Sequence, residues 1–203
     1  AGKPIGSAGP VTDAGITYQK STALICADPI SGEALWKREG LEPGCALFGD
    51  AQLTFAVPPH HTKADVIDSR TGRILGKRAV PDWQHRWAIH GRFVLALEKQ
   101  PTKNPSGDAQ AEAQLSDVRL FLYDAWREED VWSQTFSDGA RGTLVKDDQV
   151  AILEPDGRFL IRSLHNADVV LSQKIEPETN LTAIYVLPST DRYLRRSEAR
   201  RVG

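Results

Sequence analysis

The side chains best suited to catalysis or metal binding are dispersed through this sequence of 203 residues. No two histidines have the His-x-x-x-His spacing that directs a pair of imidazoles at one metal ion. No acidic cluster has the spacing of a calcium-binding loop. We therefore predict no catalytic, metal-binding or cofactor-binding residue, and interpret all five histidines as surface or rim residues: His60, His61, His85, His90 and His165.

Three large side chains are instead candidates for binding a partner. Trp83 and Arg86 stand in "DWQHR" and Arg141 stands in "SDGARG"; tryptophan and arginine are typical anchors of protein interfaces. All three fall in segments that connect successive groups of predicted strands, on the same side as a polar insertion at 101–116. We predict a binding rim here. The alternatives are that Trp83 packs over a seam between sheets, and that the insertion is a tolerated loop without anchors.

The two cysteines, Cys26 and Cys45, are each expected on a predicted strand. Buried free thiols are the expected state, because cysteine behaves as a small apolar residue. A disulfide would require their Cα atoms to lie within about 7 Å of each other. The sequence does not fix that distance, so the redox compartment stays open.

The elements that must position these residues repeat along the chain. A nine-residue motif begins with aspartate and ends eight positions later. The copies are Asp28–Trp36, Asp68–Gly76, Asp124–Trp132 and a degenerate Leu164–Ser172. Their first residues lie 40, 56 and 40 positions apart, and the long interval contains the 16-residue insertion 101–116. The underlying period is therefore 40 residues throughout, with one loop inserted.

Each period contains four short segments rich in Val, Ile, Leu, Phe and Thr and bounded by Gly, Pro, Asp or Asn, which is typical of strands. Tandem four-stranded units predict a β-propeller, because one blade has two apolar faces that only neighbouring blades can bury. A β-sandwich also uses short strands, but it gives no reason for a phrase at a constant interval. We therefore predict an all-β fold, a partial (open) β-propeller of four four-stranded blades plus the start of a fifth. The predicted blades span about residues 4–39, 45–79, 87–136 and 143–175, and the next begins at 181–194.

The phrases "ICADPISGEALWKREG", "DVIDSRTGRILGKRAV" and "LFLYDAWREEDVWSQTF" resemble the repeat of PQQ-like β-propeller proteins, the quinoprotein-type or BamB-like family. The segments "EPGCALFGD" and "LTAIYVLPS" resemble the large PQQ-like repeat proteins of planctomycete bacteria. The residues that match the structural positions of the repeat are Asp28, Gly32, Trp36, Asp68, Gly72, Asp124 and Trp132. The sequence departs from the pattern at Gly76 and Ser172, where tryptophan is missing, and in the last two copies, which lack Thr-Gly.

The resemblance implies two alternative functions. One is a non-catalytic scaffold, or a module that binds a protein or peptide through its loop rim, within a larger bacterial protein whose other segments complete the propeller. The other is a fragment of a PQQ-dependent quinoprotein oxidoreductase. Such enzymes use adjacent cysteines near the cofactor, and Cys26 and Cys45 are not adjacent. The scaffold is therefore favoured, with enzymatic activity left open. The compartment is unknown, and the resemblance allows a periplasmic or membrane-anchored protein.

Charge and hydrophobicity argue against nucleic-acid binding and against a membrane-spanning helix. The formal net charge is −2, which provides no basic surplus for nucleic acid. No apolar run approaches the roughly 20 residues of a membrane helix.

The sequence lacks methionine, and we expect an internal fragment, residues 1–195. Residues 196–203, "RSEARRVG", resemble the translation of a sequencing adapter and are predicted to be a non-native tail. The alternative is a frayed basic terminus.

Overall fold

The computed structural model describes residues 6–82, 85–100, 117–137, 139–145, 148–177, 181–187 and 192–197. Trp83, the insertion at 101–116 and most of the predicted tail therefore lie outside the described residues. The first two tail residues are described. Arg196 and Ser197 end a strand in which they pair with Ala183 and Leu181.

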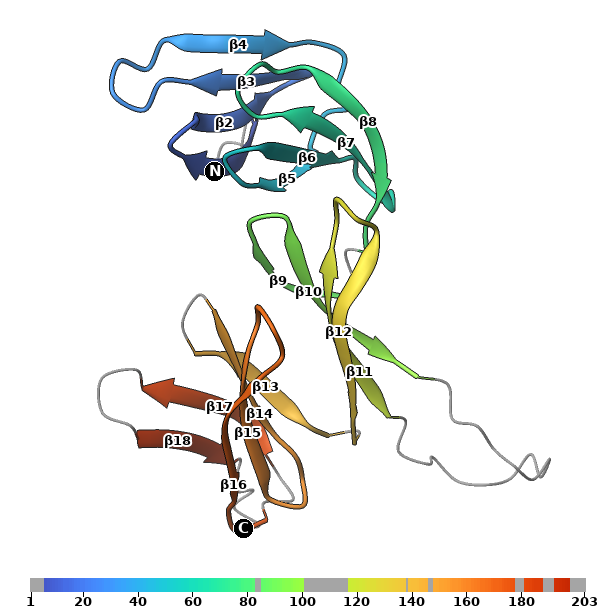
Figure 1. Ribbon diagram of the computed structural model, residues 1–203, viewed down its shortest axis with the longest axis vertical. Coiled ribbons are helices and arrows are strands. Elements are labelled where there is room, and N and C mark those ends of the chain that lie inside the picture. Colours follow the sequence, from blue (N-terminus) through green and yellow to red (C-terminus); the bar gives the residue numbers. More distant parts are fainter. Residues whose placement is uncertain are drawn as a thin grey trace, which may run out of the picture. The chain divides into compact units, whose positions relative to one another are not determined.

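The described residues form four sheets of four strands each, followed by a sheet of two (Figure 1). Within each sheet the strands follow chain order, so consecutive strands are hydrogen-bonded neighbours. The chain is thus an all-β protein of the β-propeller class, with four blades and two strands of a fifth sheet. The first two blades are β1 (Gly6–Thr12), β2 (Gly15–Lys20), β3 (Ala23–Ala27) and β4 (Ala34–Arg38), then β5 (Ala46–Gly49), β6 (Leu53–Val57), β7 (Lys63–Asp68) and β8 (Ile74–Ala79). The rest are β9 (Arg86–His90), β10 (Phe93–Lys99), β11 (Val118–Asp124) and β12 (Glu129–Phe136), then β13 (Arg141–Leu144), β14 (Gln149–Leu153), β15 (Arg158–Ser163) and β16 (Val169–Lys174), and finally β17 (Leu181–Leu187) and β18 (Arg192–Ser197).

The chain divides into two compact units, and the boundary passes through the third sheet. In the first unit β1 lies beside β5, and one apolar cluster joins the first two sheets through Leu24, Ala56 and Ile67. In the second unit β13 lies beside β17. The first two sheets therefore bury apolar faces against each other, which is what a single sheet cannot do alone.

The repeated aspartate builds the turn between the third and fourth strands of a sheet. The carboxylate of Asp28 accepts hydrogen bonds from the N–H groups of Ile30 and Ser31, at 2.8 and 2.7 Å. Asp68 and Asp124 accept from the corresponding N–H groups of their own turns. At the fifth position the backbone is left-handed, with φ of +73° at Gly32, +67° at Gly72 and +59° at Glu128. Glycine adopts this conformation without steric cost, which accounts for its place in the first two copies.

The fourth copy of the repeat begins one residue earlier than predicted, at Ser163 rather than Leu164. The hydroxyl of Ser163 takes the part of the aspartate and accepts the N–H of His165 at 3.2 Å. Four residues after Ser163, Ala167 has a φ of +61°. The predicted span Leu164–Ser172 is therefore wrong by one position, because a serine oxygen replaces the carboxylate that marked the other copies.

The tryptophans of the repeat cover the junctions, or seams, between neighbouring sheets. The indole N–H of Trp36, on β4, donates to the carbonyl of Ser69 in the turn of the next sheet at 2.8 Å. Trp132, on β12, donates to the carbonyl of Leu164 at 3.1 Å. Both acceptors directly follow the residue that opens the turn, Asp68 or Ser163. A large apolar side chain with one polar atom therefore covers each of these turns and satisfies a backbone carbonyl.

The second sheet lacks this tryptophan and uses an arginine instead. Arg78 donates through Nε to the carbonyl of Trp126 at 3.2 Å. Its guanidinium also lies over the Trp126 ring, 4.5 Å from the ring centroid. Stacking and hydrogen bonding by Arg78 thus close the seam at which Gly76 leaves the tryptophan position empty.

The turn aspartates predict a specific acid sensitivity. Hydrogen bonds from the backbone N–H groups of Ser31 and Ile30 lower the pKa of Asp28, and the N–H of Thr71 lowers the pKa of Asp68. A lowered pKa in the folded state contributes stability that is present above the unfolded pKa, about 3.9, and is lost as pH falls through the folded value. We expect the free energy of unfolding of the parent protein to fall more steeply below about pH 4 than that of the double variant D28N/D68N.

Urea unfolding at a series of pH values between about 5 and 2.5 measures this difference. Asparagine keeps an oxygen that can accept the same N–H groups, so the variant retains the turn and loses only the titration. Identical slopes for the two proteins would show that these carboxylates do not contribute to the acid transition.

Candidate binding pocket at the loop rim

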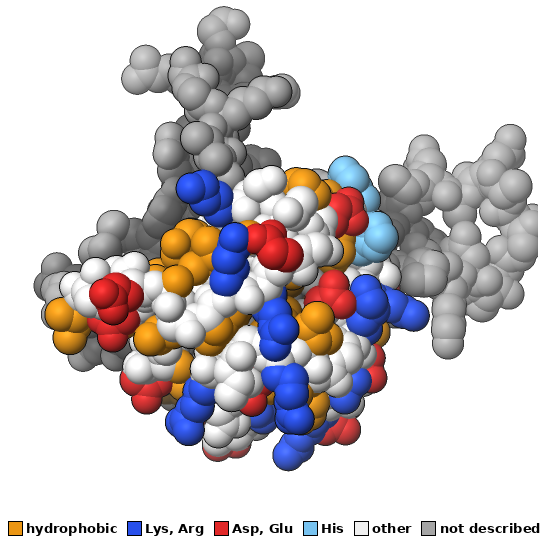
Figure 2. All heavy atoms as spheres, turned by 90° about the horizontal axis from the view of Figure 1, so that it is seen from above, with side chains coloured by type: hydrophobic (Ala, Val, Ile, Leu, Met, Phe, Trp, Pro, Cys, Tyr) orange, Lys and Arg blue, Asp and Glu red, His pale blue; other side chains and the backbone are white. Residues whose placement is uncertain are grey.

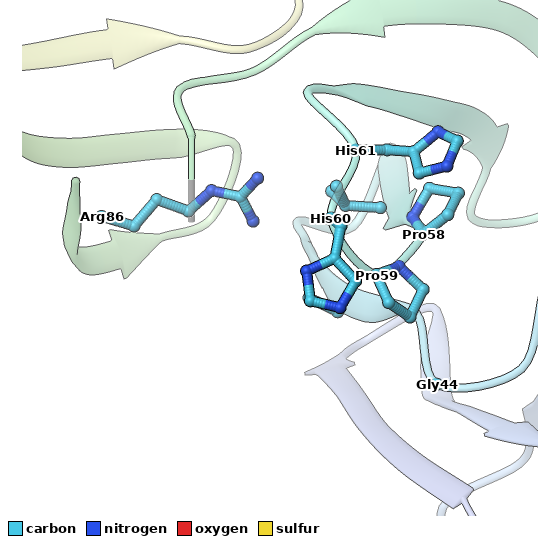
Figure 3. A pocket seen from close by; sticks show the side chains of 8 residues that line it. Gly44, Pro58, Pro59, His60, His61 and Arg86 are labelled. Carbon is cyan, nitrogen blue, oxygen red and sulfur yellow. The ribbon is translucent and has the colours of Figure 1, made fainter. Parts of the chain in front are cut away.

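A cavity of about 270 Å³ lies in the first unit, where three loop segments meet (Figure 3). The connection from β4 to β5 contributes Gly44, and β5 itself contributes Ala46. The end of β6 and the loop that follows contribute Val57, Pro58, Pro59, His60 and His61. Arg86, the first residue of β9, completes the lining. We call this cavity the rim pocket.

The strand order explains why these segments meet. The β4–β5 and β8–β9 segments connect one sheet to the next, whereas the β6–β7 loop joins the second and third strands within a sheet. In an up-and-down meander, all such segments leave the strands at the same end. The repeat turns built on Asp28 and Asp68 lie at the other end of the same strands.

Arg86 is the only arginine among the described residues that line the rim pocket, and in Figure 3 its guanidinium points toward the His60 loop. Its Nε donates to the carbonyl of Pro81 at 2.8 Å. Its Nη2 is buried and has no hydrogen-bond partner. Burial lowers the pKa of Arg86 and the charge of Asp82 opposes that shift, but arginine stays protonated at neutral pH. An enclosed N–H group without an acceptor costs roughly 1–3 kcal/mol, and more where the group is charged.

The opposite wall is the loop "PPHH", Pro58 to His61. The carbonyl of Pro58 accepts the N–H of His61 at 3.2 Å, which closes a tight turn. His60 has a φ of +63°, an uncommon conformation for a residue other than glycine. Both histidine side chains are exposed, and Nε2 of His61 lies 4.0 Å from a carboxylate oxygen of Glu42. The wall thus combines two apolar proline rings with two imidazoles at the mouth.

A buried glutamine holds the β4–β5 connection in place. Gln19 is 1 % exposed, and its amide donates to the carbonyl of Glu42 at 2.6 Å. Its amide oxygen accepts the N–H of Cys45 at 2.9 Å. The two bonds fix the segment that carries Gly44. Gln19 therefore positions one wall of the rim pocket, a role that no feature of its sequence neighbourhood indicates.

Both cysteines are buried free thiols, as expected. The Sγ of Cys45 donates to the carbonyl of Glu42 at 3.0 Å, so it belongs to the same support. Burial raises the pKa of the Cys26 and Cys45 thiols. Because the thiolate is the reactive form, these residues are structural rather than nucleophilic.

Of the three predicted rim residues, the structure places Arg86 in the rim pocket. Trp83 lies outside the described residues. Arg141 belongs to the second unit, where it is exposed and donates to the carbonyl of Ala140 at 3.1 Å. Sequence analysis interpreted His60 and His61 as surface or rim residues but did not identify the prolines before them as a wall. The proline pair was the available signal.

Within the parts of the chain that the structure describes, no group of three or more His, Cys, Asp or Glu side chains is placed to hold a metal ion. The same parts contain no helix with the length and apolarity needed to cross a membrane. The surface seen in Figure 2 shows Lys and Arg side chains interspersed with acidic and hydrophobic ones. The rim pocket is therefore distinguished by the buried, unpaired Nη2 of Arg86 rather than by a concentration of charge.

Comparisons with known proteins return distant likenesses. No protein-family model matches the sequence, and no curated protein matches it. Among solved structures, the chain is similar to BamB from Moraxella catarrhalis, with 15 % identity over 92 % of this chain and 68 % of that one and a TM-score of 0.35. It is also similar to the β-propeller domain of Cps50 (Swd1) from Myceliophteria thermophila, with 11 % identity over 97 % and 63 % and a TM-score of 0.43. A third is the computationally designed protein Ika8, with 10 % identity over 91 % and 66 % and a TM-score of 0.41. The chain spans about two thirds of the length of each.

Proposed function

We propose that this chain is a non-catalytic β-propeller module that binds a protein or peptide segment through its loop rim, as part of a larger bacterial protein. The observation that carries the proposal is the unpaired Nη2 of Arg86, enclosed beside a cavity. Loops held by a rigid β-scaffold are the usual place for binding residues. Enclosed arginines are frequent anchors of protein interfaces. Trp83 in the first unit and Arg141 in the second are proposed as further binding residues.

Selection of peptide ligands tests this function even though the partner is unidentified. The whole chain is immobilised and challenged with a displayed library of random 12-residue peptides. We expect selected peptides to lose about tenfold or more in affinity when Arg86 is replaced by alanine, the loss typical of an anchor residue. Arg70→Ala is the matched control, because Arg70 is exposed in a repeat turn at the other end of β7. A library that yields no ligand, or ligands indifferent to both Arg86→Ala and Arg141→Ala, would reject the proposed rim.

A further inference from the structure

The arginine that lines the rim pocket has a hydrogen-bond donor without an acceptor. Nη2 of Arg86 is enclosed and unpartnered, while Nε of the same guanidinium is already bonded to the carbonyl of Pro81. A positive group in this state is stabilised most by a negatively charged acceptor, because charge-assisted hydrogen bonds are the stronger kind. Arg86 lines the cavity and its guanidinium points toward the opposite loop, so an anion that enters the cavity lies beside this positive group (Figure 3).

The walls restrict which anion fits. Pro58 and Pro59 have no N–H group to offer, and Val57 and Ala46 add apolar surface. Capture of a peptide C-terminus commonly uses a nest of backbone N–H groups, and phosphate is commonly held by a cluster of arginines. This pocket has one arginine and a proline-rich wall. Its chemistry matches a single carboxylate attached to a short aliphatic stem.

The mouth of the pocket favours the same ligand. His60 and His61 are exposed beside the opening and can each donate a hydrogen bond. The acidic groups that act on the lining are Glu42, which lies 4.0 Å from His61, and Asp82, whose charge acts on Arg86. Neither carboxylate belongs to the lining itself. The side-chain donors around the opening thus come from two imidazoles and one guanidinium (Figure 3).

We propose that the rim pocket binds the side-chain carboxylate of a glutamate or aspartate in a peptide segment, with Arg86 as the anion-binding residue and the Pro58–Pro59 wall against the aliphatic stem. This inference rests on the proposed function, which it makes specific. It assigns the pocket an acidic peptide as its ligand class. A cavity of about 270 Å³ has room for a side chain of that kind.

Three N-acetylated peptides test the assignment: Ac-Gly-Glu-Gly-NH2, Ac-Gly-Gln-Gly-NH2 and, with a free C-terminus, Ac-Gly-Gly-Gly-OH. Each is titrated into the ¹⁵N-labelled whole chain at neutral pH, and shifts of the amide signals of Gly44, Ala46, His60 and His61 are followed. We expect saturable shifts with the glutamate peptide. We expect at least tenfold weaker binding of the glutamine peptide, since it lacks the charge that the guanidinium recognises.

The variant Arg86→Gln is expected to weaken the glutamate peptide at least tenfold, whereas the matched Arg70→Gln leaves it unchanged. The glutamate-to-glutamine comparison needs no variant, so it decides the matter even if Arg86→Gln fails to fold. Equal binding of those two peptides, or tighter binding of the free C-terminus at the same residues, overturns the inference. Such a failure differs from failure of the proposed function, in which peptide selection yields no ligand that depends on the rim.

Discussion

Replacing Phe55 with alanine is expected to lower the free energy of unfolding by about 3–5 kcal/mol, the usual cost of removing a buried aromatic ring. Phe55 is 0 % exposed and stands at the centre of β6, all five of whose residues are buried. Its ring stacks on that of Phe48, with the centroids 4.9 Å apart. The same apolar cluster includes Val66 and Val94. Truncation leaves a cavity that surrounding strands cannot close without breaking their ladders.

Urea unfolding followed by far-ultraviolet circular dichroism measures the loss. Phe55→Leu is the matched control, because it keeps most of the apolar volume and is expected to cost less than half as much as the alanine change. A loss below about 1 kcal/mol for Phe55→Ala would show that β6 is not a core strand.

The fold was predictable because its organising contacts are local in the sequence. The carboxylates of Asp28 and Asp68 bind N–H groups two and three residues ahead. Such contacts must recur at a fixed place in each repeat, so the period is visible without a structure. The strands between them are short and apolar, and the all-β, four-bladed prediction followed from their number per period.

The prediction of the repeat was less accurate where serine replaces aspartate or arginine replaces tryptophan. Ser163 accepts an N–H as the aspartates do. The fourth copy therefore has no carboxylate to mark its first residue, and its predicted start is one residue too late. Arg78 covers the turn that a tryptophan covers elsewhere. Its position, two residues beyond Gly76, is not the tryptophan position of the repeat. When a different residue at a different position provides the same packing, the sequence shows no repeated residue that would reveal it.

The binding site was predictable only in part, because it depends on contacts between distant segments. Arg86 was expected on a rim from its residue type and its place between blades. That its Nη2 is enclosed and unpaired is a property of three-dimensional packing. Gln19 supports the pocket through Glu42 and Cys45, more than twenty positions along the chain. No local spacing encodes such a bond.

The repeat turns provide a second large effect, in which two glycines at the same repeat position respond differently to alanine. Gly32 and Gly72 have nearly the same left-handed backbone, with φ of +73° and +67°. A Cβ at Gly32 meets nothing within 4 Å, whereas a Cβ at Gly72 would lie 2.7 Å from the ring of Trp36. We expect Gly32→Ala to cost about 1–2 kcal/mol, from backbone strain alone. Gly72→Ala is expected to cost about 1–3 kcal/mol more, from overpacking.

Thermal and urea unfolding of the two variants isolates the second contribution, because the backbone strain is common to both. The extra cost has a definite source: the Trp36 ring must move, and its bond to the carbonyl of Ser69 must lengthen or break. The double variant Trp36→Ala/Gly72→Ala should therefore show no overpacking, so that adding Gly72→Ala to Trp36→Ala costs only what Gly32→Ala costs. Equal losses in the free energy of unfolding for the two single glycine variants would mean that the Trp36 ring moves aside at no cost. The seam between the first two sheets would then be held by the apolar cluster around Leu24 and Ile67 rather than by the tryptophan of the repeat.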